Sequence, residues 1–255
     1  MHPKLSIIIP CYNYGQYIEE TVHSVFASTY ENIEVIIVDD GSTDLYTIEV
    51  LNKLKRKAKV TVIRRENGGL AAARNTGISF ASSPYVLLLD ADDLIESTFI
   101  EKGIELLESN KNYSYVYPLV QLFGEKNKTW ITLPFNFFYL KFRNYIPATI
   151  IIRRSSWEKV KGYDENMREG YEDWEFLLRL GKKGLFGARI NEILFFYRKH
   201  SGSMLEDSKK KHWILKKRIR KKHPDLYQFY FIQFIVFLFI ELFRRITGKI
   251  LKFDL

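Results

Sequence analysis

Three closely spaced carboxylates follow a run of apolar residues in the first half of the chain. Val86 to Leu89 leads directly into Asp90-Ala91-Asp92-Asp93, so a buried strand is expected to end where the acidic side chains begin. Clustered carboxylates raise each other's pKa, and a divalent cation relieves their repulsion. Mg²⁺ and Mn²⁺ bind oxygen ligands and keep positions open for phosphate, so the pattern indicates a metal site for a phosphate-bearing substrate. The alternative is an acidic turn in which Asp92 or Asp93 caps a helix over Ile95 to Leu107.

Polar residues follow two other apolar runs in the same way. Asp39 and Asp40 come after Ile36-Ile37-Val38, and Asp40 is the preferred contact to a ribose or base edge, although the segment is also good turn and N-cap material. Asn67-Gly68-Gly69 lets the backbone approach a ligand closely, as ordinary turns also require. Arg74, one turn into the next helix, is placed either for phosphate binding or for a surface salt bridge.

Two further polar groups lie far downstream. Glu172-Asp173 precedes the apolar Phe176 to Leu178, and Asp173 beside Trp174 is the candidate general base, because partial desolvation keeps a carboxylate basic. The alternative for this pair is helix capping. Arg198 and His200 end a predicted strand and could bind diphosphate or complete a metal shell, whereas lone histidines are more often surface or core residues.

The surrounding elements explain why these groups would meet. Apolar runs over 5–9, 33–38, 60–64 and 85–89 predict strands, and helices are expected over 17–28, 47–57 and 70–80. Strands that are apolar throughout fit a parallel sheet covered by helices on both faces. Ligands of such sheets bind beyond the carboxyl ends of the strands, where all these polar residues fall. Beyond Ser109 we predict strands over 148–152 and 193–197, and helices over 155–160 and 174–180.

Composition narrows the class of protein. A chain of 255 residues with 46% hydrophobic content can bury the core of one large α/β domain. The lone cysteine, Cys11, is expected in the core, and the absence of both a disulfide pair and an apolar leader favours a reducing compartment. The net charge of +9 does not indicate nucleic-acid binding, because Ser208 to Lys222 holds nine Lys or Arg residues and no acid, which leaves the remainder neutral.

The C-terminal segment differs from the rest of the chain. An apolar, aromatic-rich stretch over Leu226 to Phe243 is followed by Arg244, Arg245 and Lys249. It is short for a span and contains polar interruptions, so an amphipathic helix lying on anionic lipid is expected over 208–250. The alternatives are a terminal helix packed on its own domain or on a second subunit, which would make the protein a homodimer.

Five motifs taken together resemble the family 2 glycosyltransferases. They are Ile7-Ile8-Ile9-Pro10-Cys11-Tyr12-Asn13, Val38-Asp39-Asp40-Gly41-Ser42-Thr43-Asp44, Asn67-Gly68-Gly69-Leu70-Ala71-Ala72-Ala73-Arg74-Asn75, Asp90-Ala91-Asp92 and Glu172-Asp173. The resemblance covers about residues 4–203, including an acceptor-side segment from 153 to 165. Lys161 departs from it, since many relatives have glycine there. The implied fold is α/β of GT-A type, with a Rossmann-like, mostly parallel sheet flanked by helices, followed by the C-terminal amphipathic and apolar helices.

The resemblance also implies roles for individual residues. It makes Asp173 the catalytic base, Asp90 and Asp92 the Asp-x-Asp motif, and His200 a third residue near Mn²⁺ or Mg²⁺. The donor, a nucleotide-diphosphate sugar and most simply a UDP-sugar, would be contacted by the following residues: Pro10, Tyr12, Asn13, Asp39, Asp40, Gly68, Arg74, Asp90, Ala91 and Arg198.

These observations give one functional hypothesis and two alternatives. We expect a metal-dependent inverting glycosyltransferase of hexosyl type that acts on a glycan or lipid-linked acceptor in envelope polysaccharide or glycolipid synthesis. Residues 1–110 would bind the donor, 111–205 the acceptor, and 206–255 the inner face of the cell membrane from the cytoplasm. The alternatives are a catalytically silent module that binds sugar nucleotide or membrane, and a nucleotidyltransferase, against which the lack of a Gly-rich, Lys-bearing phosphate loop counts.

Overall fold

The first half of the chain alternates strands and helices, as the apolar runs predict. The computed structural model describes residues 3–201, 208 and 210–247. In order come β1 (Leu5–Cys11), α1 (Gly15–Phe26), β2 (Ile33–Asp39), α2 (Leu45–Leu54), β3 (Val60–Arg64), α3 (Leu70–Phe80) and β4 (Tyr85–Leu88). The predicted bounds of β3 and α3 are correct to the residue, and the other strands differ only at their ends.

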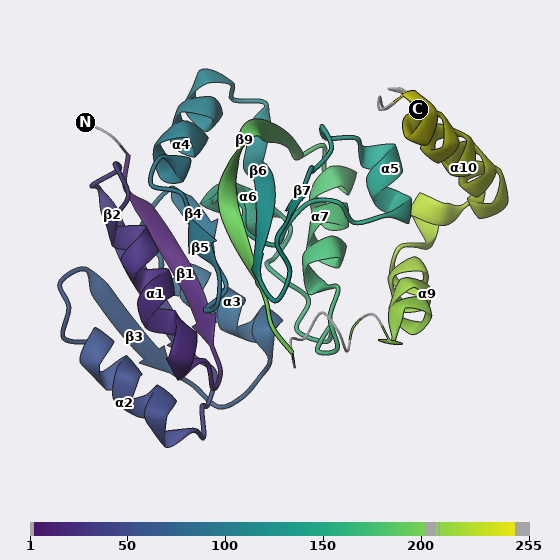
Figure 1. Ribbon diagram of the computed structural model, residues 1–255. Helices are drawn as coiled ribbons and strands as arrows, with labels where there is room; N and C mark the ends of the chain where they lie inside the picture. The colour runs from purple at the N-terminus through teal and green to yellow at the C-terminus, as the bar shows by residue number, and fades with distance from the viewer. Residues whose placement is uncertain (1–2, 202–207, 209, 248–255) are drawn as a thin grey trace.

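All strands belong to one mixed sheet in the order β3-β2-β1-β4-β8-β6-β9-β5, with β7 paired to β6 (Figure 1). The first four strands are parallel: after β1 the chain adds β2 and then β3 on one side of it, and then returns to add β4 on its other side. Polar loops after β1 and β4 therefore lie next to each other at the switch point of the sheet, where such folds bind ligands.

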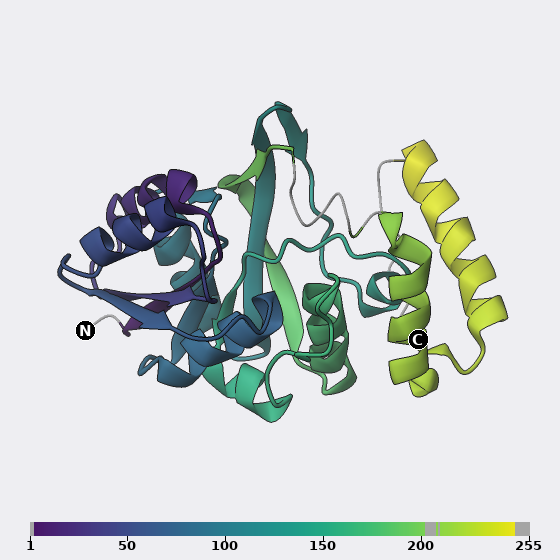
Figure 2. The same cartoon turned by 90° about the horizontal axis from the view of Figure 1, so that it is seen from below.

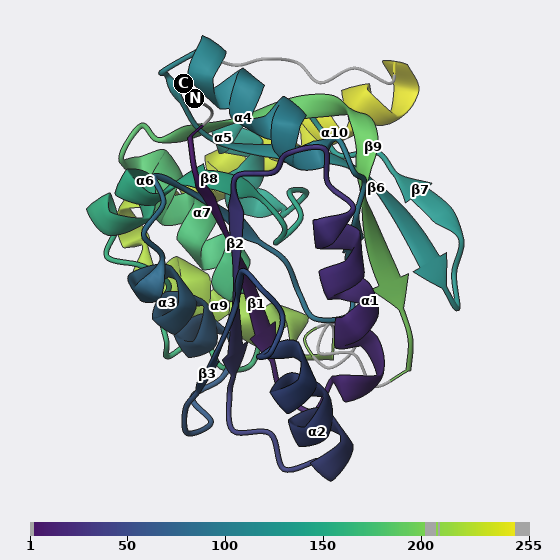
Figure 3. The same ribbon diagram turned by 90° about the vertical axis from the view of Figure 1, so that its left-hand side faces the viewer.

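Alternate residues of the central strands face two separate cores. Ile7 and Ile9 of β1 pack under α1 and α2, whereas Ile8 packs under α3. Figure 3 shows β1 and β2 between α3 on one side and α1 and α2 on the other. Burial on both faces explains why these strands are apolar throughout, and it confirms the predicted helix-covered α/β arrangement.

The second half departs from a simple parallel pattern. It contains β5 (Leu94–Ile95), α4 (Phe99–Ser109), β6 (Tyr113–Gly124), β7 (Lys128–Trp130), α5 (Phe137–Phe142), β8 (Ile151–Arg153), α6 (Arg154–Lys159), α7 (Glu172–Lys182) and β9 (Phe186–Lys199). β8 pairs antiparallel with both β4 and β6, while β6 and β9 run parallel along most of their length. The predicted helix over Ile95 to Leu107 is wrong at its start, because residues 94–95 add a short strand to β9.

Two helices and a short 3₁₀ turn follow the sheet: α9 (His212–Lys222), η1 (Pro224–Tyr227) and α10 (Tyr230–Thr247). Figures 1 and 2 show α9 and α10 beside α5 and α7, at the opposite end of the molecule from α1 and α2. Leu215, Ile219 and Ile240 are buried, so this segment is packed on the domain as well as exposed. Of the predicted tail over 206–255, positions 206, 207, 209 and 248–255, including Lys249, lie outside the described residues. Among the described residues, no helix combines the length and the apolar character needed to cross a bilayer.

Candidate active site

The acidic residues after β4 are held in place by partners from distant parts of the chain. Asp90 Oδ1 accepts a hydrogen bond from Arg74 Nη2 at 2.7 Å, and Asp92 Oδ2 lies 2.9 Å from His200 Nε2. Asp93 is buried and accepts from the backbone N–H of Arg198 at 2.8 Å. The helix-cap alternative for Asp92 and Asp93 is wrong, because α4 begins after Thr98.

Arg74 joins the two halves of the site. Its side chain is only 1% exposed, and its second terminal nitrogen donates to Glu172 Oε1 at 2.8 Å. The guanidinium also lies over the ring of Tyr163, with 5.5 Å from Cζ to the ring centroid. The surface salt bridge considered for Arg74 is thus wrong, while its contact with the nucleotide stays a prediction. Asp90, from the turn after β4, and Glu172, from helix α7, are brought together by one buried cation.

Asp173 lies directly beside this bridge on the first turn of α7. Its Oδ2 accepts a hydrogen bond from Asn144 Nδ2 at 2.9 Å. Neither Glu172 nor Asp173 is the N-cap residue of the helix, since Tyr171 holds that position, although the Asp173 carboxyl accepts a hydrogen bond from the backbone N–H of Trp174. Tyr171 itself has a left-handed backbone (φ 63°), a strained conformation of the kind found at functional sites.

Burial sets the proton affinity of these carboxyl groups. It raises the pKa of Asp173 against the opposing effect of Arg74, and it raises that of Glu172 to about 7 in the same way. Burial, together with the charges of its acidic neighbours, also raises the pKa of Asp93 and of Asp92. A buried Asp173 with a raised pKa has the property that a general base for a hydroxyl proton requires.

His200 and Arg198 hold the acidic turn against the end of β9. Burial works against charge on His200, but its hydrogen bonds to Asp92 and to the carbonyl oxygen of Ser201, together with the charge of Asp92, raise the imidazole pKa. Arg198 Nε donates to the carbonyl oxygen of Asp92 at 2.7 Å, and its guanidinium lies over the ring of Tyr17. Both residues therefore reach the acidic turn, and their contact with a diphosphate stays a prediction.

The donor set around Asp92 fits a divalent cation. Two ligands bound at right angles at about 2.1 Å from an ion lie about 3 Å apart, close to the 2.9 Å between Asp92 and His200. The crowding that raises the pKa of Asp92 and Asp93 is what a cation would relieve. Within the described parts of the chain, no three His, Cys, Asp or Glu side chains are already arranged as a metal cage. Ions that also bind phosphate oxygens are usually held by only one or two protein carboxylates.

The loops after β1 and β2 form the neighbouring part of the rim. Asn13 has a left-handed backbone (φ 58°), and its Oδ1 accepts from the N–H groups of Thr43 and Asp44 at 2.9 and 3.0 Å. Asp40 is buried and accepts from Gly68 N at 3.0 Å and Gly69 N at 2.7 Å. Asp40 and Gly68 thus connect the loops that follow β2 and β3.

The remaining predicted donor contacts differ in accessibility. Tyr12 is 44% exposed on this rim, whereas Pro10 lies buried in β1. Asp39 accepts from Ser42 N at 2.8 Å, and Ala91 from the hydroxyl of Thr21 at 2.9 Å. Each of the four is at or next to the carboxyl end of a parallel strand, and their donor contacts stay predictions.

Some residues of the site escaped sequence reasoning. Asn144 lies in a loop without a recognisable pattern and was not a candidate. The sequence indicates Asp93 as one of three clustered carboxylates or as a helix cap, but not its hydrogen bond from the backbone N–H of Arg198. The amide of Asn75, next to Arg74, donates to the carbonyl oxygen of Tyr163 and accepts from the N–H of the same residue, at 2.9 and 2.7 Å, and so connects α3 to the segment before α7.

Comparisons with known proteins agree with this geometry. Residues 6–167 match the family described as glycosyl transferase family 2. The putative teichuronic acid biosynthesis glycosyltransferase TuaG of Bacillus subtilis (strain 168) is 32% identical over 243 residues, 91% of this chain and 94% of that protein. Chondroitin synthase of Pasteurella multocida (strain Pm70) is 29% identical over 225 residues, 84% of this chain and 23% of that protein. Among solved structures, S. aureus TarS 1-349 in complex with UDP-GlcNAc superimposes with a TM-score of 0.69 at 20% identity, covering 80% of this chain and 60% of that one.

A mixed sheet with an acidic turn at its switch point is the architecture of nucleotide-sugar enzymes of GT-A type, and the likeness to TarS confirms that fold. The family match covers well over half of the chain, so the chain belongs to glycosyl transferase family 2. It spans only 23% of the length of chondroitin synthase and 60% of the solved TarS chain.

Proposed function

We propose that this protein is a metal-dependent, inverting glycosyltransferase that moves a sugar from a nucleotide-diphosphate donor to an acceptor hydroxyl. The observation that carries the proposal is the buried bridge through Arg74, which brings the acidic turn after β4 and the base-bearing start of α7 to one place. Family membership supports the reaction class. TarS was solved with UDP-GlcNAc, which supports a UDP-sugar as the donor, and TuaG is named for teichuronic acid biosynthesis, which supports an envelope glycan as the acceptor.

The proposed mechanism divides the work between two ends of the site. Asp173 takes the proton from the acceptor hydroxyl as the oxygen attacks the anomeric carbon in line with the leaving diphosphate. Asn144 holds the base by its hydrogen bond and thus fixes which oxygen faces the acceptor. Asp92 and His200, with Asp90, would hold Mg²⁺ or Mn²⁺, which when bound stabilises charge on the leaving diphosphate. Arg74 bonds to both Asp90 and Glu172, and so fixes the distance between the metal end and the base end of the site.

The decisive experiment measures sugar transfer and donor binding separately. A panel of UDP, GDP and dTDP sugars with Mn²⁺ identifies the donor by its rise in melting temperature, since a ligand of the native state stabilises it. Asp173→Asn is expected to lower transfer by about 10² to 10⁴-fold, the usual contribution of a general base, while donor binding is kept. The exposed Asp225→Asn is the matched control.

Three outcomes would count against this function. Full transfer by Asp173→Asn would remove Asp173 from the role of base. Unchanged dependence of donor binding on Mn²⁺ in Asp92→Ala would remove that residue from the metal site. A wild-type protein that binds donor but never releases nucleoside diphosphate would be a silent binding module, and release of pyrophosphate would indicate a nucleotidyltransferase.

We also propose that α10 places the enzyme on the cytoplasmic face of the membrane. One surface of this helix carries large apolar side chains that are each at least 50% exposed: Phe231, Ile232, Ile235, Leu238, Phe239, Leu242 and Ile246. Contiguous exposed apolar surface of this kind marks an interaction site, and the basic α9 beside it favours anionic lipid over a protein partner.

Vesicle co-sedimentation tests this membrane contact. Replacing Ile235 and Phe239 by serine is expected to weaken binding to vesicles without loss of folding, because both side chains already face solvent. Unchanged vesicle binding, together with a shift from dimer to monomer in light scattering, would instead assign the surface to a homodimer. Deleting the whole tail is a poorer test, since it would also uncover the core around Leu215 and Ile219.

A further inference from the structure

Apart from the exposed Lys217 and Lys221, the lysines and arginines from Lys211 to Lys222 fall into two sets. Lys211 and Arg218 form ion pairs with Glu169 at 2.7 and 2.8 Å, and Lys222 pairs with Asp164. Lys216 and Arg220, one turn apart, form no ion pair with any carboxylate among the described residues, although both are partly buried. A cation that is withdrawn from water without a counter-ion is costly, so this second pair needs an explanation.

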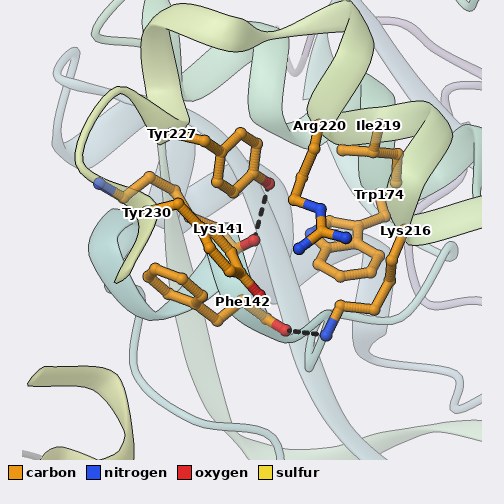
Figure 4. A pocket seen from close by; sticks show the side chains of 8 residues that line it. All are labelled: Lys141, Phe142, Trp174, Lys216, Ile219, Arg220, Tyr227 and Tyr230. Atoms are coloured by element: carbon orange, nitrogen blue, oxygen red, sulfur yellow. Dashed lines mark hydrogen bonds between the residues drawn. The ribbon is translucent and has the colours of Figure 1, made fainter. Parts of the chain in front are cut away.

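The unpaired cations converge on a small aromatic hollow. Lys216 Nζ donates to the carbonyl oxygen of Phe142 at 3.2 Å and lies 5.9 Å from the ring centroid of Trp174. The guanidinium of Arg220 lies over the ring of Tyr230 at 4.7 Å. Figure 4 shows both side chains extending from α9 past Trp174, toward the residues of α5 and the start of α10. The hollow that they line has a volume of about 10 Å³, enough for about one water-sized group.

Electrostatics at the hollow favour an anion. Burial lowers the pKa of Lys216, and the nearby charge of Arg220 lowers it further. Lys141 is also buried enough to lower its pKa, but Figure 4 shows its side chain directed away from the other two, and it donates to Gln233 at 3.3 Å. An anion between Lys216 and Arg220 would relieve their mutual repulsion and accept hydrogen bonds from both.

The exposed aromatic side chains around the hollow indicate which anion would bind there. Trp213, whose ring lies 5.5 Å from Lys216 Nζ, is 74% exposed, and Phe231 next to Tyr230 is 75% exposed. Exposed aromatic side chains beside cations are typical of protein surfaces at the level of lipid headgroups. We propose that Lys216 and Arg220 form a binding site for the phosphate of an anionic phospholipid, with one phosphate oxygen entering the hollow above Trp174.

This site rests on the proposed membrane contact and adds a specific headgroup contact to it. It would also lie close to the chemistry, because Trp174 follows the proposed base Asp173 in α7 and donates to the carbonyl oxygen of Leu140 at 2.7 Å. Lipid bound above Trp174 would therefore contact the first turn of α7, which carries the proposed base.

The test compares two pairs of charge removals on the same helix. Lys216→Gln with Arg220→Gln removes the hollow's cations, and Lys217→Gln with Lys221→Gln removes two exposed cations as the matched control. Binding is measured by co-sedimentation with vesicles of phosphatidylcholine alone and of phosphatidylcholine mixed with phosphatidylglycerol. Both pairs lose the same net charge, so the general attraction to the surface falls equally, and the inner pair is expected to lose about tenfold more affinity for the anionic vesicles.

Each other outcome has a defined meaning. Equal losses by the two pairs would overturn the phosphate site while leaving the membrane contact intact. Wild-type protein that binds neither vesicle would overturn both, without bearing on sugar transfer, which is assayed on its own. Inorganic phosphate that raises the melting temperature of the wild type but not of the inner pair, with equal vesicle binding, would overturn the lipid as the ligand. Melting of each variant without ligand checks that it folds.

Discussion

The buried Glu172 makes a sharp prediction about stability. Its carboxyl is 5% exposed and its pKa is raised to about 7 by burial, from an ordinary value of 4.5. An acid whose pKa is raised by folding stabilises the native state below its unfolded pKa, and this contribution is lost as the pH rises through the folded pKa. Each pKa unit corresponds to about 1.4 kcal/mol. Titration of Glu172 therefore lowers the free energy of unfolding by roughly 2 to 3 kcal/mol as the pH rises from 5 to 8.

Replacing Glu172 by glutamine removes this dependence, because the neutral amide resembles the protonated acid and its oxygen can still accept from Arg74. We expect Glu172→Gln to match the wild type in free energy of unfolding near pH 5 and to exceed it by roughly 2 to 3 kcal/mol near pH 8. The measurement is urea unfolding of both proteins at the two pH values. The change with pH in the variant is subtracted from the change with pH in the wild type, so the contributions of the other titrating groups cancel.

A second variant serves as the control. Glu241 is bonded to Arg244 and Tyr139, and these contacts lower its pKa to about 2. Its contribution is present above pH 4.5 and is lost only in strong acid, so Glu241→Gln should change stability by the same amount at pH 5 and pH 8. If Glu172→Gln instead loses stability equally at both pH values, the carboxylate is not desolvated as the structure implies, and the raised proton affinity of the site is refuted.

Three other predictions follow from single residues. Burial raises the pKa of Asp173, and a base must be ionised to act, so the rate of transfer should rise as the pH passes through that pKa. A value of kcat/KM that does not fall at acid pH would contradict this prediction. Lys161 has φ 60°, so Lys161→Gly should relieve backbone strain and stabilise by about 1 kcal/mol in thermal or urea unfolding, whereas a loss would show that its side chain matters. A methyl group at Gly187 would meet the buried ring of Tyr115, so Gly187→Ala should cost about 1 to 3 kcal/mol, and unchanged unfolding would show that the sheet yields there.

The elements that can be predicted from the sequence are those whose bounds are set by residues within or next to the element. Strand β3 has the predicted bounds because its apolar run defines it locally, and helix α3 has them because Gly69 marks its start. The pairing of β6 with β9 joins residues about 70 positions apart with several register shifts, and their aromatic residues gave no clean alternation. The site divides in the same way. Motifs indicated Asp90 and Glu172 separately, but only the fold shows that one arginine holds both.

The Lys161 position shows how a departure from a family pattern can be reconciled with structure. The family resemblance leads to an expectation of glycine there, and the chain at Lys161 adopts a left-handed conformation that glycine accepts without strain. The following Gly162 is also left-handed (φ 72°), and a Cβ there would collide with Asn75. The turn therefore keeps its shape with lysine at position 161, whereas position 162 requires glycine.

The charges of the site imply that metal and donor binding are coupled. Five carboxyl groups lie in or beside it, Asp90, Asp92, Asp93, Glu172 and Asp173, and the arginines that bond to this acidic cluster are Arg74 and Arg198. A diphosphate approaching such a surface would be repelled unless a cation came with it. Coupling between two ligands is reciprocal, so the donor should tighten Mn²⁺ binding by the same factor by which Mn²⁺ tightens the donor. Titrating either ligand at fixed levels of the other measures this factor, and a factor of one would mean that the two do not share this site.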